Sequence, residues 1–360
     1  MDNVTYLEIC FSFFIWLVFL FCCKSQINTN STRNRSFFWF FVGLIIYSTF
    51  GFQTGDFTHY RDLYDILIHS EDPVHVEPFY YWLTKILPEN YFVWRCAVWG
   101  LATIVLILIF RKLQFNATFA TFIFTLVLMC YFPAPRQTLG YLVLLYGFVV
   151  AFFSDKSKTK SYVFGIILVW GSFLLHKSMF VYVLLLGISL IPFGKWTYVG
   201  SVLLFPVIRQ SVYYISSFLL SSTLIDETGQ ESGEMYLDSD FYQIANFNGL
   251  IQLIMHRVPI ILLMIWAIKK LYFTKESSTA YGYKVLLQYT YILIYISFLF
   301  YGQQASAFMS PRFWDASLYP FTVFLIFFLY KQKRTPLIKV CFYMLICANI
   351  YDFTYAFYKL

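Results

Sequence analysis

The chain alternates long apolar stretches with short polar connections over nearly its whole length. The apolar stretches run to 15–22 residues with few charges, a pattern typical of transmembrane α-helices. A membrane β-barrel would instead alternate apolar and polar residues within each strand. The pattern predicts an all-α polytopic membrane protein with about twelve transmembrane helices, in a range of ten to twelve. The expected spans are 4–23, 37–53, 93–110, 116–132, 137–153, 162–175, 178–193, 197–219, 248–268, 285–301, 316–330 and 337–355.

Two of these stretches, 162–175 and 178–193, are short for a bilayer whose apolar core is about 30 Å thick. They flank His176 and Lys177 and are open to a second interpretation as a broken or re-entrant pair. Such a break requires protein or water around the backbone groups that it frees.

Two connections are long and polar, at about residues 54–92 and 220–247. The chain shows no internal repeat and no soluble domain, so residues 1–360 are predicted to form a single integral membrane domain.

Charge is sorted between the two sides of the predicted bundle. The connections after odd-numbered spans hold most of the lysines and arginines and two acids, Asp155 and Glu276. The positive-inside rule places these connections in the cytoplasm, and therefore places both termini and both long polar connections outside. The acidic N-terminus lacks the basic start of a signal peptide, so the first apolar stretch is expected to remain as a span. The net charge of +7 reflects this sorting and does not point to a nucleic-acid partner.

Composition narrows the class further. Charged residues make up 12% of the chain, about half of the usual share in soluble domains. Aromatic residues make up 23%, more than interfacial belts require, so some must pack inside the bundle or line a cavity. The seven cysteines have no metal-ligand spacing, and no nucleotide-binding motif is present. We therefore expect no metal, no cofactor and a donor that is already activated on a lipid.

Four arginines lie in or near the outer half of the predicted bundle, where an ionisable group is costly and is a functional candidate by default. They are Arg136, Arg209, Arg257 and Arg312. Guanidinium groups bind diphosphate through forked hydrogen bonds, which favours a lipid diphosphate as substrate. Arg136 and Arg312 are also open to interpretation as interfacial residues that extend towards the head groups.

Other candidates fall into two groups. Asp56, Glu77 and His176 are candidate bases for a sugar hydroxyl, although Asp56 also suits a helix cap and His176 a structural hydrogen bond. Aromatic residues on the polar connection and near Arg312 are candidate faces for sugar stacking. They are Tyr60, Tyr64, Tyr80, Trp82 and Tyr319.

Four short motifs together resemble the EpsG-like family of Wzy-type polysaccharide polymerases. The order and spacing of these motifs fit over roughly residues 40–190. The motifs are Gly55-Asp56-Phe57-Thr58-His59-Tyr60, Glu77-Pro78-Phe79-Tyr80, Pro135-Arg136-Gln137 and Leu175-His176-Lys177-Ser178.

The resemblance implies a GT-C-like fold and a metal-independent glycosyltransferase. Such proteins transfer a glycan from undecaprenyl diphosphate to the sugar of an incoming lipid-linked repeat unit, at the outer face of the bacterial inner membrane. The implied partners are undecaprenyl-diphosphate-linked oligosaccharide, membrane lipids and a chain-length regulator. A single displacement would invert the anomeric centre. A flippase for the same lipid, an O-antigen ligase and a membrane acyltransferase of surface polysaccharide remain alternatives.

Overall fold

The structure is a computed structural model of the 360-residue chain. It describes residues 6–26, 33–50, 56–69, 77–129, 135–153, 158–221, 251, 253–273, 281–301, 309–331 and 335–359.

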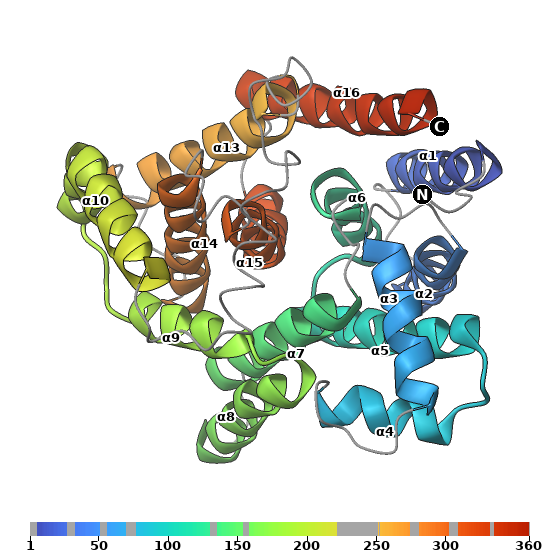
Figure 1. Ribbon diagram of the computed structural model, residues 1–360. Helices are drawn as coiled ribbons and strands as arrows, with labels where there is room; N and C mark the ends of the chain where they lie inside the picture. Colours follow the sequence, from blue (N-terminus) through green and yellow to red (C-terminus); the bar gives the residue numbers. More distant parts are fainter. Residues whose placement is uncertain are drawn as a thin grey trace. The chain divides into compact units, whose positions relative to one another are not determined.

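Within these residues the chain is helical throughout, and no strand is present. The helices are α1 Tyr6–Gln26, α2 Arg33–Phe50, α3 Asp56–His69, α4 Pro78–Ile86, α5 Tyr91–Lys112, α6 Ala117–Val127, α7 Pro135–Phe152, α8 Lys158–Leu175, α9 Met179–Ser189, α10 Lys195–Ser221, α13 Val258–Ile268, α14 Tyr281–Phe300, α15 Met309–Lys331 and α16 Pro336–Lys359 (Figure 1). Two π-helical turns, η3 Leu253–Arg257 and η4 Lys269–Phe273, flank α13.

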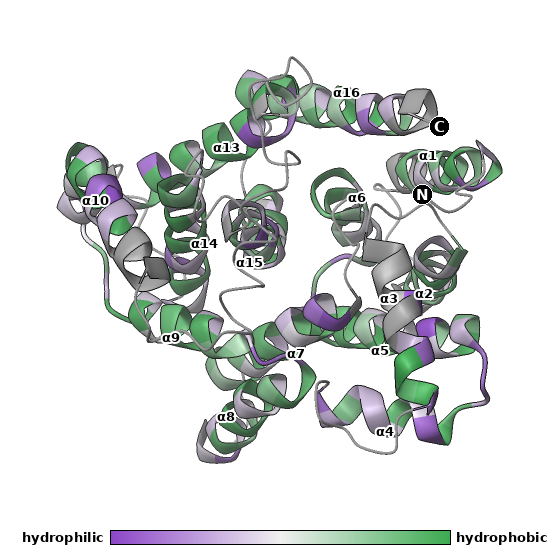
Figure 2. Cartoon of the chain, viewed as in Figure 1, coloured by the Kyte–Doolittle hydropathy of each residue, from purple (hydrophilic) through white to green (hydrophobic). Residues whose placement is uncertain are grey.

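Each of the twelve expected spans overlaps a helix, so the all-helical prediction is confirmed. Four helices within the described part of the chain, α5, α14, α15 and α16, are long and apolar enough to cross a membrane. Hydrophobic colours cover most of α5, α13 and α14 in Figure 2. The chain is therefore a membrane protein, and the full count of twelve spans stays a prediction. Helices α3 and α4 lie inside the long connection predicted at 54–92.

The chain divides into two compact units. The first holds residues 1–184, 325–333 and 345–360, and the second holds residues 185–324 and 334–344. The single domain over residues 1–360 stays a prediction, and the two units are described in turn.

In the first unit, α7 and α8 form a closely packed antiparallel pair (Figure 1). Glycines let their backbones approach: a β-carbon on Gly147 would lie 2.7 Å from the carbonyl oxygen of Gly165, and one on Gly165 would lie 2.8 Å from the β-carbon of Ala151. Small residues at helix crossings have this effect in membrane proteins. Since the pair is antiparallel, the start of α7 and the end of α8 lie at the same end of it.

Substituting Gly165 with alanine is expected to destabilise the protein by about 1–3 kcal/mol, because the new methyl group meets backbone atoms that cannot move aside. Gly171 on the same helix is the matched control, since a β-carbon there meets nothing within 4 Å. Gly171→Ala should be neutral or stabilising by up to about 1 kcal/mol, because alanine favours a helix over glycine. Melting temperatures of the detergent-solubilised variants measure both effects, and equal melting temperatures would contradict the close crossing.

The break between α8 and α9 spans His176, Lys177 and Ser178. Its backbone N–H groups all have protein acceptors: His176 donates to the Ser172 carbonyl at 3.1 Å, Lys177 to the Glu77 carboxylate at 3.4 Å and Ser178 to His176 Nδ1 at 3.2 Å. The predicted interruption is thus confirmed, and its backbone groups are satisfied by protein as the membrane setting requires.

Helices α1 and α2 of the first unit pack against α6. The Trp16 indole donates to the Thr125 carbonyl at 3.2 Å, and the Asn349 amide donates to the Leu126 carbonyl at 3.2 Å. Both carbonyls belong to the last turn of α6, so α1 and α16 each have a polar contact with that turn.

In the second unit a buried glutamine closes the C-terminal end of α9. The amide nitrogen of Gln288 donates to the carbonyls of Ser189 and Ile191, both at 2.8 Å, and its oxygen accepts from the hydroxyl of Tyr272 at 3.1 Å. These bonds satisfy helix-end carbonyls that would otherwise be buried without partners.

Candidate functional site

Glu77 lies immediately before α4, where Pro78 starts the helix, because proline is favoured at a first helical position. The side chain does not cap its own helix. It is 4% exposed and forms an ion pair with Arg136 of α7. The other carboxylate oxygen accepts from the Lys177 backbone N–H. Both oxygens of the carboxylate are therefore already engaged by protein donors.

Arg136 is the second residue of α7, whose first residue is Pro135. Its positive charge lies at the positive end of the helix dipole, so a nearby carboxylate is needed to offset it. Glu77 supplies that charge, and the Tyr80 ring lies 5.4 Å from the guanidinium carbon. The Tyr80 hydroxyl also donates to the Arg136 carbonyl at 3.2 Å. The guanidinium group is thus held in one position from two sides.

The His176 turn completes this cluster. The Lys177 backbone N–H donates to the Glu77 carboxylate. Gly140 lies one turn after Arg136, and a β-carbon built on it would lie 3.5 Å from the β-carbon of His176. Glu77, Arg136 and His176 come from three separate motifs, and the structure brings these motifs together in the first unit. We call Glu77, Tyr80, Arg136 and the turn His176–Ser178 the Glu77–Arg136 cluster.

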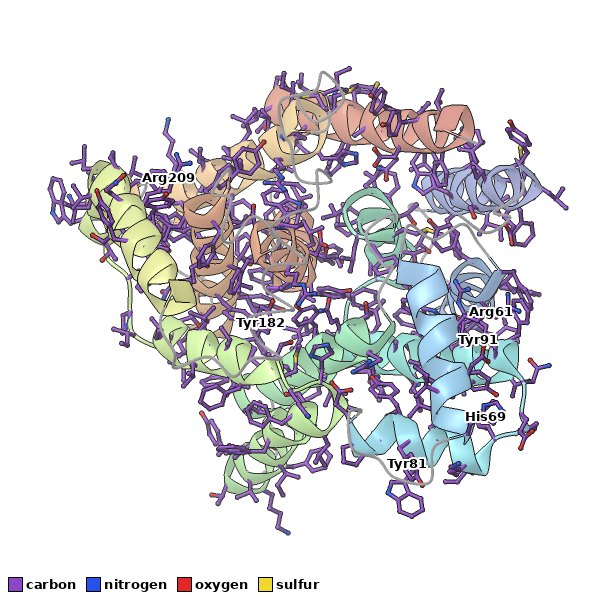
Figure 3. The ribbon with its side chains drawn as sticks, viewed as in Figure 1. Arg61, His69, Tyr81, Tyr91, Tyr182 and Arg209 are labelled. Atoms are coloured by element: carbon purple, nitrogen blue, oxygen red, sulfur yellow. The ribbon has the colours of Figure 1, made fainter. Side chains whose placement is uncertain are left out.

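An aromatic contact holds α9 against α7 next to this cluster in the sequence of both helices. Tyr141 and Tyr182 meet edge to face with ring centroids 4.8 Å apart, and both rings are buried. Tyr182 is labelled in Figure 3.

An aromatic group supports the cluster from the side of α5. Trp94 is fully buried and lies 6.1 Å from Tyr80, 5.8 Å from Tyr64 and 6.2 Å from Tyr91, measured between ring centroids. Tyr91 and Arg61 lie on neighbouring helices in Figure 3, α5 and α3. These contacts hold the amphipathic α3 and α4 against the N-terminal part of α5.

Burial argues against three of the expected sugar-stacking rings. Tyr80 is 0% exposed, and Tyr64 and Tyr319 are each 3% exposed, so their faces are covered by other side chains. Burial and the negative charge of Glu89 also raise the pKa of the Tyr64 hydroxyl. All three rings pack against other side chains in the described part of the chain, and their role in binding a sugar stays a prediction.

Trp82 differs from them, since it is 62% exposed on α4. It remains a candidate face for a sugar. The backbone of Asp56 and Tyr60 belongs to the start of α3, and the side chains of both lie outside the described residues.

In the second unit, Arg257 ends the π-helical turn η3, a feature frequent at functional sites. Its guanidinium carbon lies 5.1 Å from the Tyr301 ring and 5.0 Å from the Trp314 ring. Arg209 of α10 donates to the Tyr301 carbonyl at 2.8 Å and is labelled in Figure 3. Two of the four predicted arginines thus meet at Tyr301.

Arg312 lies in the first turn of α15, two residues before Trp314. It therefore belongs to the same unit as Arg209 and Arg257, whereas Arg136 belongs to the first unit.

Arg95 is a buried charge that the sequence analysis missed. It is 1% exposed within α5, interacts electrostatically with Glu8 of α1 and is hydrogen-bonded to Tyr91 one turn earlier. It lies inside the span expected at 93–110, but it is not among the four arginines expected to be functional. Its position between Trp94 and a continuous apolar run was the available signal, since a cation there requires partners.

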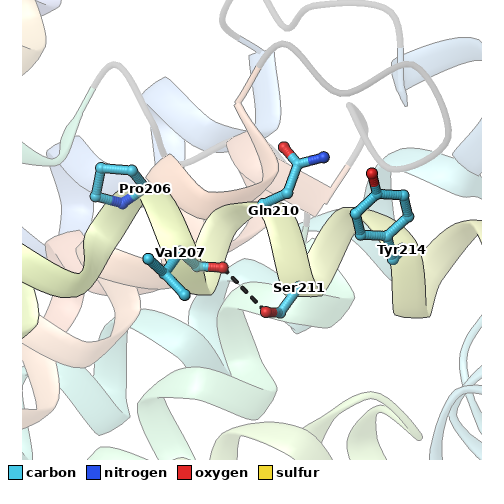
Figure 4. Close-up of a pocket in the computed structure, with 5 residues that line it drawn as sticks. All are labelled: Pro206, Val207, Gln210, Ser211 and Tyr214. Atoms are coloured by element: carbon cyan, nitrogen blue, oxygen red, sulfur yellow. Dashed lines mark hydrogen bonds between the residues drawn. The ribbon is translucent and has the colours of Figure 1, made fainter.

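A groove of about 490 Å³ lies along α10, lined by Pro206, Val207, Gln210, Ser211 and Tyr214 (Figure 4). All five residues come from one helix, and none of the four predicted arginines lines the groove. It holds none of the candidate chemistry.

The chain matches the EpsG family over residues 34–359, well beyond the 40–190 region that carries the motifs. Neither a curated relative nor a solved structure matches it. The matched region includes both the Glu77–Arg136 cluster and the arginines of the second unit. The chain belongs to the EpsG family and is a membrane protein of polysaccharide biosynthesis.

Proposed function

We propose that this protein is a polysaccharide polymerase that transfers an undecaprenyl-diphosphate-linked glycan to the sugar of an incoming lipid-linked repeat unit. The observation that carries the proposal is the Glu77–Arg136 cluster, in which three motifs far apart in the chain meet around one oriented guanidinium group. The reaction is assigned to the outer face of the bacterial inner membrane, in a GT-C-like fold, with no metal or cofactor.

The reaction forms one bond and breaks one. The acceptor hydroxyl oxygen attacks the anomeric carbon of the donor, and the bond from that carbon to the diphosphate oxygen breaks with its electron pair remaining on the diphosphate. The hydroxyl proton passes to a base, for which Asp56, Glu77 and His176 are the candidates from the sequence. Attack on the face opposite the leaving group inverts the anomeric centre.

Arg136 stabilises the negative charge that develops on the diphosphate. Its position is fixed by Glu77 and Tyr80 before substrate arrives, and a donor that needs no reorganisation contributes most to catalysis. The expectation from the sequence assigns three arginines of the second unit to diphosphate binding as well. They are Arg209, Arg257 and Arg312. Exposed Trp82 is assigned to a sugar.

Reconstitution tests the activity directly. Purified protein in liposomes is supplied with synthetic undecaprenyl-diphosphate-linked repeat units, and products are separated by length. A ladder of elongated lipid-linked glycans supports the polymerase. Translocation of the lipid without elongation would identify a flippase, transfer to lipid A core a ligase, and acyl-group incorporation from a labelled acyl donor an acyltransferase.

Replacing Arg257 with lysine is expected to lower polymer yield by about tenfold, because an ammonium group does not stack between the Tyr301 and Trp314 rings as a planar guanidinium does. The yield is measured as long-chain glycan in a polymerase-deletion strain at matched expression. Arg111→Lys, at the exposed end of α5, is the control and should be unchanged. Equal yields from both variants would remove Arg257 from the site.

A further inference from the structure

We propose that His176 acts as a neutral hydrogen-bond donor through Nε2 to an anionic oxygen of the diphosphate, and that Ser178 is the positioning residue that fixes its tautomer. This assignment rests on the proposed function. It gives His176 a role different from that of a base, the one expected from the sequence.

The hydrogen bonds of the turn determine the tautomer. The Ser178 backbone N–H donates to His176 Nδ1 at 3.2 Å, and the Ser178 hydroxyl lies 2.7 Å from the same nitrogen. A backbone N–H has a proton and no lone pair to offer, so Nδ1 must accept and must be unprotonated. In a neutral imidazole the single proton then lies on Nε2.

The start of α9 favours this neutral form. His176 lies three residues before Met179, the first residue of α9, and its side chain accepts from the backbone N–H two residues on, as the side chain in an Asx turn does. Protonating Nδ1 would remove that bond and place a positive charge at the positive end of the helix dipole. The ring is thus held as a donor at Nε2 by local structure.

The neighbours of His176 identify what the donor serves. The His176 β-carbon packs at Gly140, one turn after Arg136 on the same face of α7. The next residue, Lys177, donates its backbone N–H to the carboxylate that pairs with Arg136. These two contacts place the His176 turn against the Glu77–Arg136 ion pair. An Nε2 donor on this turn suits an oxygen that gains negative charge, and it does not suit the abstraction of a proton.

The assignment leaves the proton balance intact. His176 keeps its proton throughout and stabilises the departing diphosphate by hydrogen bonding alone. The acceptor proton goes to a carboxylate. Asp56 and Glu77 then remain as the candidate bases, and Glu77 already accepts two hydrogen bonds from protein.

Two substitutions separate the possible roles of His176. In His176→Gln the terminal amide places an N–H near the position of Nε2, and an amide cannot act as a base at neutral pH. In His176→Asn the shorter side chain places an oxygen near the position of Nδ1, where it can accept from the Ser178 N–H in an Asx turn, and leaves nothing at Nε2. Each is compared with wild type and His176→Ala for ladder formation in liposomes and for melting temperature in detergent.

We expect His176→Gln to retain activity within about tenfold of wild type, and both His176→Asn and His176→Ala to lose about 100-fold, with His176→Asn melting like wild type. Loss of activity in both His176→Gln and His176→Asn, with normal melting, would overturn the donor role and restore the base. Activity in His176→Asn with a lowered melting temperature in His176→Gln would make the residue purely structural. Absence of a ladder from the wild type would instead overturn the proposed function, so the two failures are distinguishable.

Discussion

Replacing Arg136 with alanine is expected to reduce polymer formation by about 100- to 1,000-fold, the loss typical of removing one preorganised donor from developing negative charge. The effect should be this large because the guanidinium group is already oriented by Glu77 and Tyr80, and alanine supplies none of its planar donors. The measurement is the rate of ladder formation by purified protein in liposomes.

Two comparisons isolate the role of the guanidinium group. Arg136→Lys keeps the charge and loses the forked geometry, so it should recover only part of the rate. Arg111→Ala removes an exposed arginine from the end of α5 and should leave the rate unchanged. A wild-type rate in Arg136→Ala, with protein that is correctly folded, would exclude Arg136 from diphosphate stabilisation.

Replacing Glu77 with alanine is expected to destabilise the protein by about 3 kcal/mol, because it leaves the Arg136 charge buried at a helix N-terminus without its partner. The side chains of Glu77 and Arg136 are only 5% and 14% exposed, so water can compensate little of this loss. Thermal unfolding of detergent-solubilised protein measures the effect. Glu89→Ala, an exposed acid on the same connection, is the matched control and should melt like wild type.

The double variant Glu77→Leu with Arg136→Met separates stability from activity. Replacing both partners of a buried ion pair with apolar residues of similar size is often neutral or stabilising, so its melting temperature should return towards that of wild type. Its polymerase activity should stay lost, because the guanidinium group is gone. If Glu77→Ala and Glu89→Ala melt at the same temperature, the ion pair contributes nothing to the fold.

The Glu77–Arg136 cluster also explains why three short motifs were enough to indicate a common site. Glu77-Pro78 places an acid before a helix, Pro135-Arg136 places a cation in the first turn of another, and His176 interrupts a third region between two helices. Each motif marks a helix end, which is where backbone groups and side chains need partners. In this cluster the residues of one motif are the partners of the residues of another.

The aromatic residues were harder to assign from sequence. Tyr64, Tyr80 and Trp82 occupy similar polar surroundings in the chain, yet the first two are buried and the third is exposed. In α4, Tyr80 and Trp82 lie on different faces, and only the packing of that helix against α5 and α8 decides which face is covered. Periodicity gives the angle between two residues on a helix but not the direction in which the helix is turned.

The sequence alone determined that this is an all-helical membrane protein, where its long apolar helices lie along the chain, and which acid, arginine and histidine motifs are functional candidates, because hydropathy and the cost of charge in lipid are local properties. Only the tertiary structure decided that Glu77 pairs with Arg136, that the Ser178 backbone N–H donates to His176 Nδ1, and that Arg95 is buried beside Tyr91. These are contacts between helix ends and faces. They depend on how helices cross, as at Gly147 and Gly165, and a linear pattern of residues does not specify that crossing.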